Sequence, residues 1–391
     1  MNKALTPSRR AKDYIPLSIP HMGRLELGLI REAFRTNYIS TSGPNLTQFE
    51  KEFSEFTGLP TAAVSCGTVG IHLAVRLAGI GPGDEVVVPT LTFVGGCNPV
   101  LYEKGIPVFI DSERRSWNMD PELLDRFLKK RARVNKMPKA IIVAHLFGQS
   151  ADMDPILSAA RSYEIPVIED AAESLGASYK LKLTGTLGEV GVYSFNGNKI
   201  ITSSSGGAVV SPNAAWVDKA RFWSKQARDP DRTMNYRHSE IGYNYRMSNI
   251  LAGIARGQLR VLPKRIQQRR AIASRYHEAF ADLPGLEPMP QAEYGQQTNW
   301  LSCFLINPKV FGLNQKRLIQ FLAAAHVEAR PVWRPMHVQK LFKHYECVGG
   351  GVAEDLNRRG VCLPSSSCLS LEDQQLVIDL VREAHALSKR R

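Results

Sequence analysis

The 391-residue chain lacks long hydrophobic runs, paired cysteine motifs and internal repeats. No apolar stretch approaches the roughly 18 residues that a membrane-spanning helix needs, and the start, MNKALTPSRRAKDYIP, has no apolar segment typical of a signal peptide. The six cysteines are scattered and form no C-x-x-C pair, which favours reduced thiols over a disulfide framework or a zinc site. We therefore expect a cytoplasmic protein with no membrane segment and no bound metal.

Basic residues outnumber acidic ones, with 50 Lys and Arg against 37 Asp and Glu and a formal net charge of +13. Such an excess is common in nucleic-acid-binding proteins, but no nucleic-acid-binding motif is recognisable in the sequence. Part of the excess lies near the two ends, and another part in the run 264–270, whose pattern indicates a solvated helix face. We therefore expect no nucleic-acid partner, and an anionic small substrate accounts for the charge equally well.

Short apolar runs alternate with helical patterns from about residue 60 onward. Seven of these runs have the length and composition of strands. The alternation is typical of β-α-β units around a mostly parallel sheet, so the sequence predicts an α/β fold with seven strands in one sheet. The predicted strands lie in residues 61–65, 85–90, 106–111, 139–148, 165–172, 191–195 and 206–211.

After residue 250 the pattern changes to a long amphipathic helix, which Pro263 is expected to break or bend. A strand at 300–306 and helices at 315–326 and 371–388 indicate a smaller C-terminal α+β domain. Three glycines at 349–351 predict a flexible loop within it. The predicted organisation is a flexible tail over 1–14, a large domain over 15–262 and a small domain over 263–391.

Lys199 follows an apolar run and opens a Ser- and Gly-rich segment. A lone lysine is usually exposed and inert, but three other features accompany this one. Asp170 ends an apolar strand, where sheets of this type hold ligand groups. Gly67 and Thr68 lie at a strand-to-helix turn, where backbone N–H groups can hold a phosphate. Phe93 lies in a loop after another strand, where its ring could cover a heteroaromatic cofactor.

Each of these features alone has a structural explanation: Asp170 as a turn residue, Phe93 as core, and Gly67 and Thr68 as an ordinary helix start. Together they supply what pyridoxal 5'-phosphate requires. The lysine binds its aldehyde as a Schiff base, and a carboxylate beside the pyridine nitrogen keeps that nitrogen protonated, so the ring can accept electrons from a substrate carbanion. The sequence therefore predicts a pyridoxal-phosphate enzyme with Lys199 as its catalytic residue.

Most of the predicted large domain also resembles a known family, the DegT/DnrJ/EryC/StrS sugar aminotransferases. The motifs are SCGTVGIHLA, GPGDEVVVPTLTFV, HLFGQSADMD, VIEDAAESLGA, YSFNGNKIITSSSGG and HSEIGYNYRMSNILAGIARGQL. The resemblance implies the fold of aspartate aminotransferase, which is fold type I of the pyridoxal-phosphate-dependent transferases. Some relatives are dehydratases with histidine in place of the lysine, so Lys199 favours an aminotransferase.

The same resemblance implies roles for individual residues around the cofactor. Lys199 would carry the cofactor and move the proton, and Asp170 would face the pyridinium nitrogen. Three residues would hold the cofactor phosphate, namely Gly67, Thr68 and Ser194.

Three further residues receive roles from the resemblance. Phe93 would stack on the cofactor ring, and Glu173 would lie near the ring hydroxyl, where relatives often have glutamine. Asn244, in GYNYRMS, would reach the phosphate of the neighbouring subunit's cofactor. The resemblance therefore implies a homodimer with shared active sites.

Within the family, FNGNKIIT, HSEIGYNYRMSN, EARPVWRPMH and RRGVCLPS most resemble the UDP-4-keto-6-deoxy-N-acetylglucosamine 4-aminotransferases of bacillosamine-type pathways. This implies glutamate as amino donor, a nucleotide-linked keto-sugar as acceptor, and pyridoxamine 5'-phosphate between the two half-reactions. Arg330, Arg334 and Asn196 are candidates for contacting the sugar nucleotide, and the two arginines could equally form structural ion pairs. A dTDP- or GDP-linked sugar, amination at carbon 3, and a non-catalytic regulatory protein that binds the cofactor remain alternatives.

Overall fold

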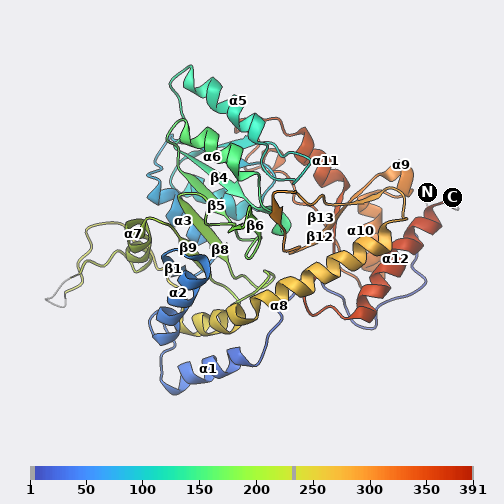
Figure 1. Ribbon diagram of the computed structural model, residues 1–391, viewed down its shortest axis with the longest axis horizontal. Helices are drawn as coiled ribbons and strands as arrows, with labels where there is room; N and C mark the ends of the chain where they lie inside the picture. Colours follow the sequence, from blue (N-terminus) through green and yellow to red (C-terminus); the bar gives the residue numbers. More distant parts are fainter. Residues whose placement is uncertain (1–4, 231–234, 390–391) are drawn as a thin grey trace.

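The computed structural model describes residues 5–230 and 235–389, and its centre is an eight-stranded sheet (Figure 1). The strand order is β1-β9-β8-β5-β4-β2-β3-β14, and only β9 runs antiparallel to its neighbours. All seven predicted strands are present, which confirms the mostly parallel α/β fold. They are β1 (Thr61–Val64), β2 (Glu85–Pro89), β3 (Ile106–Ile110), β4 (Ala140–Ala144), β5 (Val167–Asp170), β8 (Val190–Ser194) and β9 (Gly207–Val210).

Helices pack around this sheet and continue into the C-terminal part of the chain (Figure 1). In the large domain these are α1 (Leu25–Arg35), α2 (Pro44–Thr57), α3 (Gly67–Leu77), α4 (Asn98–Tyr102), α5 (Pro121–Ala132), α6 (Met153–Arg161) and α7 (Ala214–Ser224). The 3-10 turns η1 (Val94–Gly96) and η2 (Leu146–Gly148) follow strand ends. A small antiparallel sheet has β6 (Ser178–Tyr179) at its centre, between β11 (Gly295–Gln296) and β7 (Lys182–Leu183).

The C-terminal part has its own antiparallel sheet, in the order β10-β12-β15-β13. This agrees with the predicted α+β character, and the predicted strand and the two helices after residue 300 are all present. The elements are β10 (Leu286–Pro288), β12 (Ser302–Ile306), α9 (Pro308–Phe311), α10 (Gln315–Ala324), β13 (Arg330–Pro331), η3 (Met336–Val338), α11 (Gly351–Arg359), β15 (Gly360–Leu363) and α12 (Leu371–Lys389).

The eighth strand of the main sheet, β14 (Cys347–Val348), is a correction to the predicted seven. It pairs with β3 in parallel, with Cys347 opposite Phe109. Two residues are too few to produce a strand pattern in the sequence. The following glycines are not a free loop either, because the Asp111 carboxylate accepts hydrogen bonds from the N–H groups of Gly350 and Ala353 at the start of α11.

One continuous helix, α8 (Asn249–Phe280), runs from the large domain to the small one (Figure 1). It is 32 residues long and passes through Pro263 without ending. The interpretation of residues 264–270 as a solvated face is wrong at two positions, since Arg265 is 5% exposed and Arg269 is 1% exposed. Spacing of charges could not reveal this, because the chain packs other segments on both sides of this part of the helix.

The N-terminal segment predicted as a flexible tail packs against the small domain from residue 5 onward. Ala11 and Ile15 are buried in a cluster with Phe280. The Ala11 N–H donates to the Ala325 carbonyl at 3.0 Å, and the Ile15 N–H donates to that of His326 at 2.9 Å. The prediction of a flexible tail is therefore wrong for this segment. Its polar composition could not reveal that residues 280–327 of the same chain form a surface that it packs against.

No helix within residues 5–230 and 235–389 has the length and apolarity to cross a membrane. Nor do these residues bring three or more His, Cys, Asp or Glu side chains together in a way that could hold a metal ion.

Candidate active site

A cavity of about 240 Å³ opens at the carboxyl edge of the main sheet. The last residues of β4, β5 and β8 all line it, namely Ala144, Asp170 and Ser194. Neighbouring parallel strands end at the same edge, which is why residues distant in sequence meet there. Eight of the predicted site residues line this one cavity: Gly67, Thr68, Phe93, Asp170, Glu173, Ser194, Asn196 and Lys199.

The start of α3 forms one wall of the cavity. Gly67 is its first residue, and no side chain caps the helix. The N–H groups of a first helical turn have no partner within the helix and carry the positive end of its dipole, so they favour an anion. A Cβ atom at Gly67 would lie 2.8 Å from the Ser194 Cβ, and one at Gly95 would lie 2.9 Å from the Thr68 Oγ1. Glycine therefore keeps open a cradle that fits a phosphate.

Asp170 presents its carboxylate to the cavity from the end of β5. Its Oδ1 accepts a hydrogen bond from the Ala172 N–H at 3.1 Å. Burial raises the pKa of Asp170, while that hydrogen bond and the nearby charge of Lys199 lower it. Among the described residues no cationic nitrogen lies within 4.0 Å of it, so the carboxylate is available to a positively charged ligand group such as a protonated pyridine nitrogen.

Glu173 is 7% exposed and is held from two sides. Its Oε2 accepts from the Phe147 N–H at 2.9 Å, and its Oε1 accepts from the Trp333 Nε1 at 3.1 Å. The Lys199 Nζ lies 4.0 Å from the same Oε1. Burial raises the pKa of Glu173 and the charge of Lys199 lowers it. The structure therefore places a second carboxylate of the cavity beside the Lys199 amine.

Three aromatic side chains also line the cavity, those of Phe93, Trp300 and Trp333. The Lys199 Nζ lies 4.3 Å from the centre of the Trp300 ring. Phe147 stacks nearly parallel to Trp300 at 6.5 Å and to Trp333 at 6.1 Å. Phe93 is 52% exposed and lies 5.7 Å from Trp333. The sequence predicted Phe93 but missed both tryptophans, for which the only signals were the rarity of tryptophan and the ARPVWRPMH motif.

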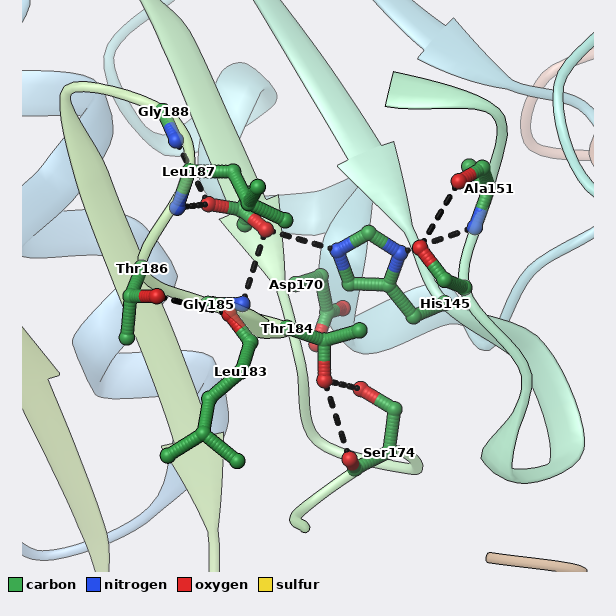
Figure 2. A network of polar contacts seen from close by, with 12 residues as sticks. His145, Ala151, Asp170, Ser174, Leu183, Thr184, Gly185, Thr186, Leu187 and Gly188 are labelled. Carbon is green, nitrogen blue, oxygen red and sulfur yellow. Dashed lines mark hydrogen bonds and ion pairs between the residues drawn. The ribbon is translucent and has the colours of Figure 1, made fainter. Parts of the chain in front are cut away.

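A buried hydrogen-bond network lies next to Asp170 and includes His145 (Figure 2). The His145 Nε2 lies 2.9 Å from the Glu169 Oε2, and the His145 Nδ1 accepts from the Ala151 N–H at 3.1 Å. Since Nδ1 is an acceptor, the ring proton is on Nε2 and is donated to Glu169. His145 also lines the cavity. The sequence did not single it out, because it lies inside the predicted strand 139–148, whereas in the structure it directly follows the end of β4.

Three predicted residues lie outside this cavity. Asn244 lines a separate groove with Lys225 and Arg246. Arg330 is exposed and pairs with Glu328 at 2.8 Å, and Arg334 lines a third groove on the small domain. From this segment it is Trp333 that faces the cavity. The roles of Asn244, Arg330 and Arg334 therefore stay predictions.

The chain is similar to several known proteins along nearly its whole length. EpsN of Bacillus subtilis is 47% identical over 94% of this chain and 95% of its own. GDP-perosamine synthase of Caulobacter vibrioides is 36% identical over 93% of this chain and 96% of its own. The crystal structure of the aminotransferase TlmJ from Streptoalloteichus hindustanus superimposes with a TM-score of 0.88 at 28% identity, covering 96% and 99% of the two chains.

Residues 20–382 match the DegT/DnrJ/EryC1/StrS aminotransferase family. The similarities confirm the predicted fold of the pyridoxal-phosphate-dependent aminotransferases and the cofactor, pyridoxal 5'-phosphate. The cavity fits that cofactor, since it joins a glycine-lined helix start, an available carboxylate and one lysine. The chain belongs to the DegT/DnrJ/EryC1/StrS family of sugar aminotransferases.

Proposed function

We propose that this chain transfers an amino group from glutamate to the 4-keto carbon of a UDP-linked 4-keto-6-deoxy-N-acetylhexosamine, for the synthesis of an amino-sugar-containing glycan. The observation that carries the proposal is the convergence of Lys199, Asp170 and the start of α3 on one cavity. Pyridoxal phosphate, when bound there, supplies a ring that accepts electrons from the carbon that loses its proton.

The chain's own residues supply the rest of the reaction. Lys199 holds the cofactor covalently and, when its amine is free, takes the proton from the donor's α-carbon and returns one to the acceptor. Asp170 would hold the protonated ring nitrogen of the cofactor, and Trp300 and Trp333, which line the same cavity, would exclude water from the amine. One lysine serves both half-reactions, so we expect ping-pong kinetics.

The choice of sugar nucleotide has two candidates. UDP is supported by the resemblance of FNGNKIIT, EARPVWRPMH and RRGVCLPS to the UDP-sugar 4-aminotransferases. GDP is supported by the 36% identity to GDP-perosamine synthase. In either case Asn196 would contact the sugar from the cavity wall, and Arg330 and Arg334 would act on the nucleotide only if a bound substrate reaches beyond the cavity.

Covalent attachment at Lys199 is tested with borohydride and peptide mass mapping. In the wild type the cofactor's mass should become fixed to the peptide that carries Lys199. Lys199→Ala should show no fixed cofactor, and its kcat should fall by about 10⁴-fold, because general acid–base catalysis at one group is worth up to this amount. Attachment that persists in Lys199→Ala would refute the assignment.

The substrate is tested by offering glutamate with a panel of UDP-, dTDP- and GDP-linked keto-sugars and identifying the product by mass and NMR. We expect amination of UDP-4-keto-6-deoxy-N-acetylglucosamine at carbon 4. Turnover of the GDP-linked sugar alone would favour the second candidate. A wild type that binds the cofactor but aminates none of the panel would favour the non-catalytic alternative.

We also propose a cytoplasmic homodimer in which Asn244 completes the partner's active site. Apolar side chains stand exposed on and just after α1, which suits a face that another subunit covers: Leu25, Leu27, Phe34, Tyr38 and Ile39. Mixing inactive Lys199→Ala with Asn244→Ala should restore about a quarter of wild-type activity, since half the dimers are hybrids with one complete site. No recovery, after co-purification of two differently tagged subunits has verified their exchange, would contradict the shared site.

A further inference from the structure

Arg269 is a fully buried arginine in the middle of α8. Among the described residues no carboxylate lies within 4.0 Å of it, and burial lowers its pKa to about 10. Its guanidinium instead donates from Nη1 to the carbonyl oxygens of Trp300 and Ser365, and from Nη2 to the Ser18 Oγ at 3.0 Å. Burying a cation without a counter-ion costs folding free energy, so the presence of an arginine at this position needs an explanation other than stability.

Two of the three acceptors lead to the same atom, the carbonyl oxygen of Asn198. The Ser18 hydroxyl accepts from Arg269 and donates to that oxygen at 2.8 Å. Trp300 accepts from Arg269 through its own carbonyl and donates from its Nε1 to the same oxygen at 2.7 Å. Asn198 immediately precedes Lys199, so the carbonyl that receives both bonds belongs to the peptide group of the reactive lysine.

Trp300 connects Arg269 to the amine of Lys199 as well. Its ring lies 4.3 Å from the Lys199 Nζ, within the distance of a cation–π contact. The backbone around Lys199 is a turn, closed by the Lys199 N–H on the Asn196 carbonyl, and Ser203 to Ser205 follow after three residues. A turn of this kind makes few contacts within itself that could fix the Lys199 side chain. The position of that side chain therefore depends on residues from other segments that contact the turn.

We propose that Arg269 is a positioning residue for Lys199. Through Ser18 and Trp300 it fixes the Asn198 carbonyl, and through Trp300 it also fixes the ring that lies beside the Lys199 amine. The proposal rests on the proposed function only in taking Lys199 as the reacting group. Arginine suits this task because its planar fork can donate to three acceptors at once, whereas a lysine ammonium at the same place is a shorter point donor. A misplacement of a reacting group by 1 Å can cost about 10²-fold in rate.

The test compares Arg269→Lys and Ser18→Ala with a matched control, Arg275→Lys. Arg275 lies on the same helix and donates to Gln374 at 2.6 Å, away from Ser18, Trp300 and Asn198. The first readout is the acetylation rate of Lys199 in the full-length, cofactor-free protein, measured by peptide mass spectrometry against exposed lysines. The second is kcat and KM for the keto-sugar. Circular dichroism establishes that each variant is folded.

We expect Ser18→Ala to raise the acetylation rate of Lys199 about fivefold, the equivalent of one lost hydrogen bond. Arg269→Lys should raise it further and lower kcat by about 10- to 100-fold with KM within about twofold, while Arg275→Lys changes neither. A folded Arg269→Lys with unchanged acetylation and kcat would overturn the proposal. If Arg269→Lys does not fold, unchanged acetylation in Ser18→Ala overturns it. Altered acetylation in a protein that aminates no sugar would support the positioning role and refute the proposed function.

Discussion

Glu169 and Arg269 are two buried charges of opposite sign, and the protein surrounds them in different ways. The Glu169 carboxylate accepts four hydrogen bonds, from the N–H groups of Gly185, Leu187 and Gly188 and from His145. The Arg269 guanidinium makes three, and its Nε has no partner in the described part of the chain. The carboxylate is fully satisfied, whereas the guanidinium is not.

The hydrogen-bond partners of the two groups also differ in how far apart they lie in the sequence. Three of the four donors to Glu169 come from one turn before β8, so this network is local to the large domain and supports the strand that ends in Asp170 (Figure 2). The acceptors around Arg269 come from residues 18, 300 and 365. Glu169 therefore stabilises one part of the large domain. Arg269 instead connects three distant segments of the chain near Lys199.

Removing Glu169 should have the largest effect on stability. Glu169→Ala leaves three backbone N–H groups and the His145 ring without an acceptor, and we expect the free energy of unfolding to fall by about 3–5 kcal/mol. Urea unfolding followed by circular dichroism measures it. The exposed Glu287→Ala is the control, with an expected change within about 0.5 kcal/mol. A loss below 1 kcal/mol for Glu169→Ala would remove the distinction between the two buried charges.

Replacing Arg269 with an apolar side chain should cost less. Arg269→Met retains volume but leaves two carbonyl groups and a hydroxyl without their donor. It also removes the cost of burying the unsatisfied Nε, so we expect the free energy of unfolding to fall by only about 2–3 kcal/mol. The same urea titration measures the difference. A larger loss than that of Glu169→Ala would reverse the order of the comparison.

Removing one donor to Glu169 should have a smaller effect than removing the acceptor. His145→Phe keeps a ring of similar shape and leaves the three backbone donors in place, so we expect a loss of about 1–2 kcal/mol. A double-mutant cycle with Glu169→Ala isolates the coupling between the two side chains. If the two losses were simply additive, the hydrogen bond between His145 and Glu169 would contribute nothing.

The smallest effect is expected at Glu173, and it should depend on pH. Burial raises the pKa of Glu173 in the folded chain, so the folded state binds more protons and the free energy of unfolding falls as pH rises from the ordinary glutamate pKa of about 4.3 to the raised value. Glu173→Gln removes this loss in the cofactor-free protein. Its advantage over the wild type should grow through that pH window by about 1.4 kcal/mol per unit of pKa shift. Unfolding midpoints over a pH series test this, and an advantage that shrinks with rising pH would contradict it.

The sheet-edge half of the active site was predictable because its signals are local. Ser194 was predicted from the resemblance to the family, but the other positions have signals of their own: Asp170 ends an apolar run, Gly67 opens the helix after another, and parallel strands bring such ends together. Lys199 follows from the same pattern. The aromatic half was not predictable, since Trp300 and Trp333 come from the C-terminal part of the chain and neither follows a strand of the main sheet.

The main sheet, the residues at its carboxyl edge, the cofactor and the family were predictable, because apolar periodicity and short motifs encode them locally. The burial of individual charges was not predictable and became evident from the folded chain. Arg269 looked like part of a solvated helix face, and Asp170 and Glu169 are adjacent acids that the sequence does not rank by burial. Burial depends on what packs against a helix or strand from distant parts of the chain, and the spacing of charges along one element carries no record of it.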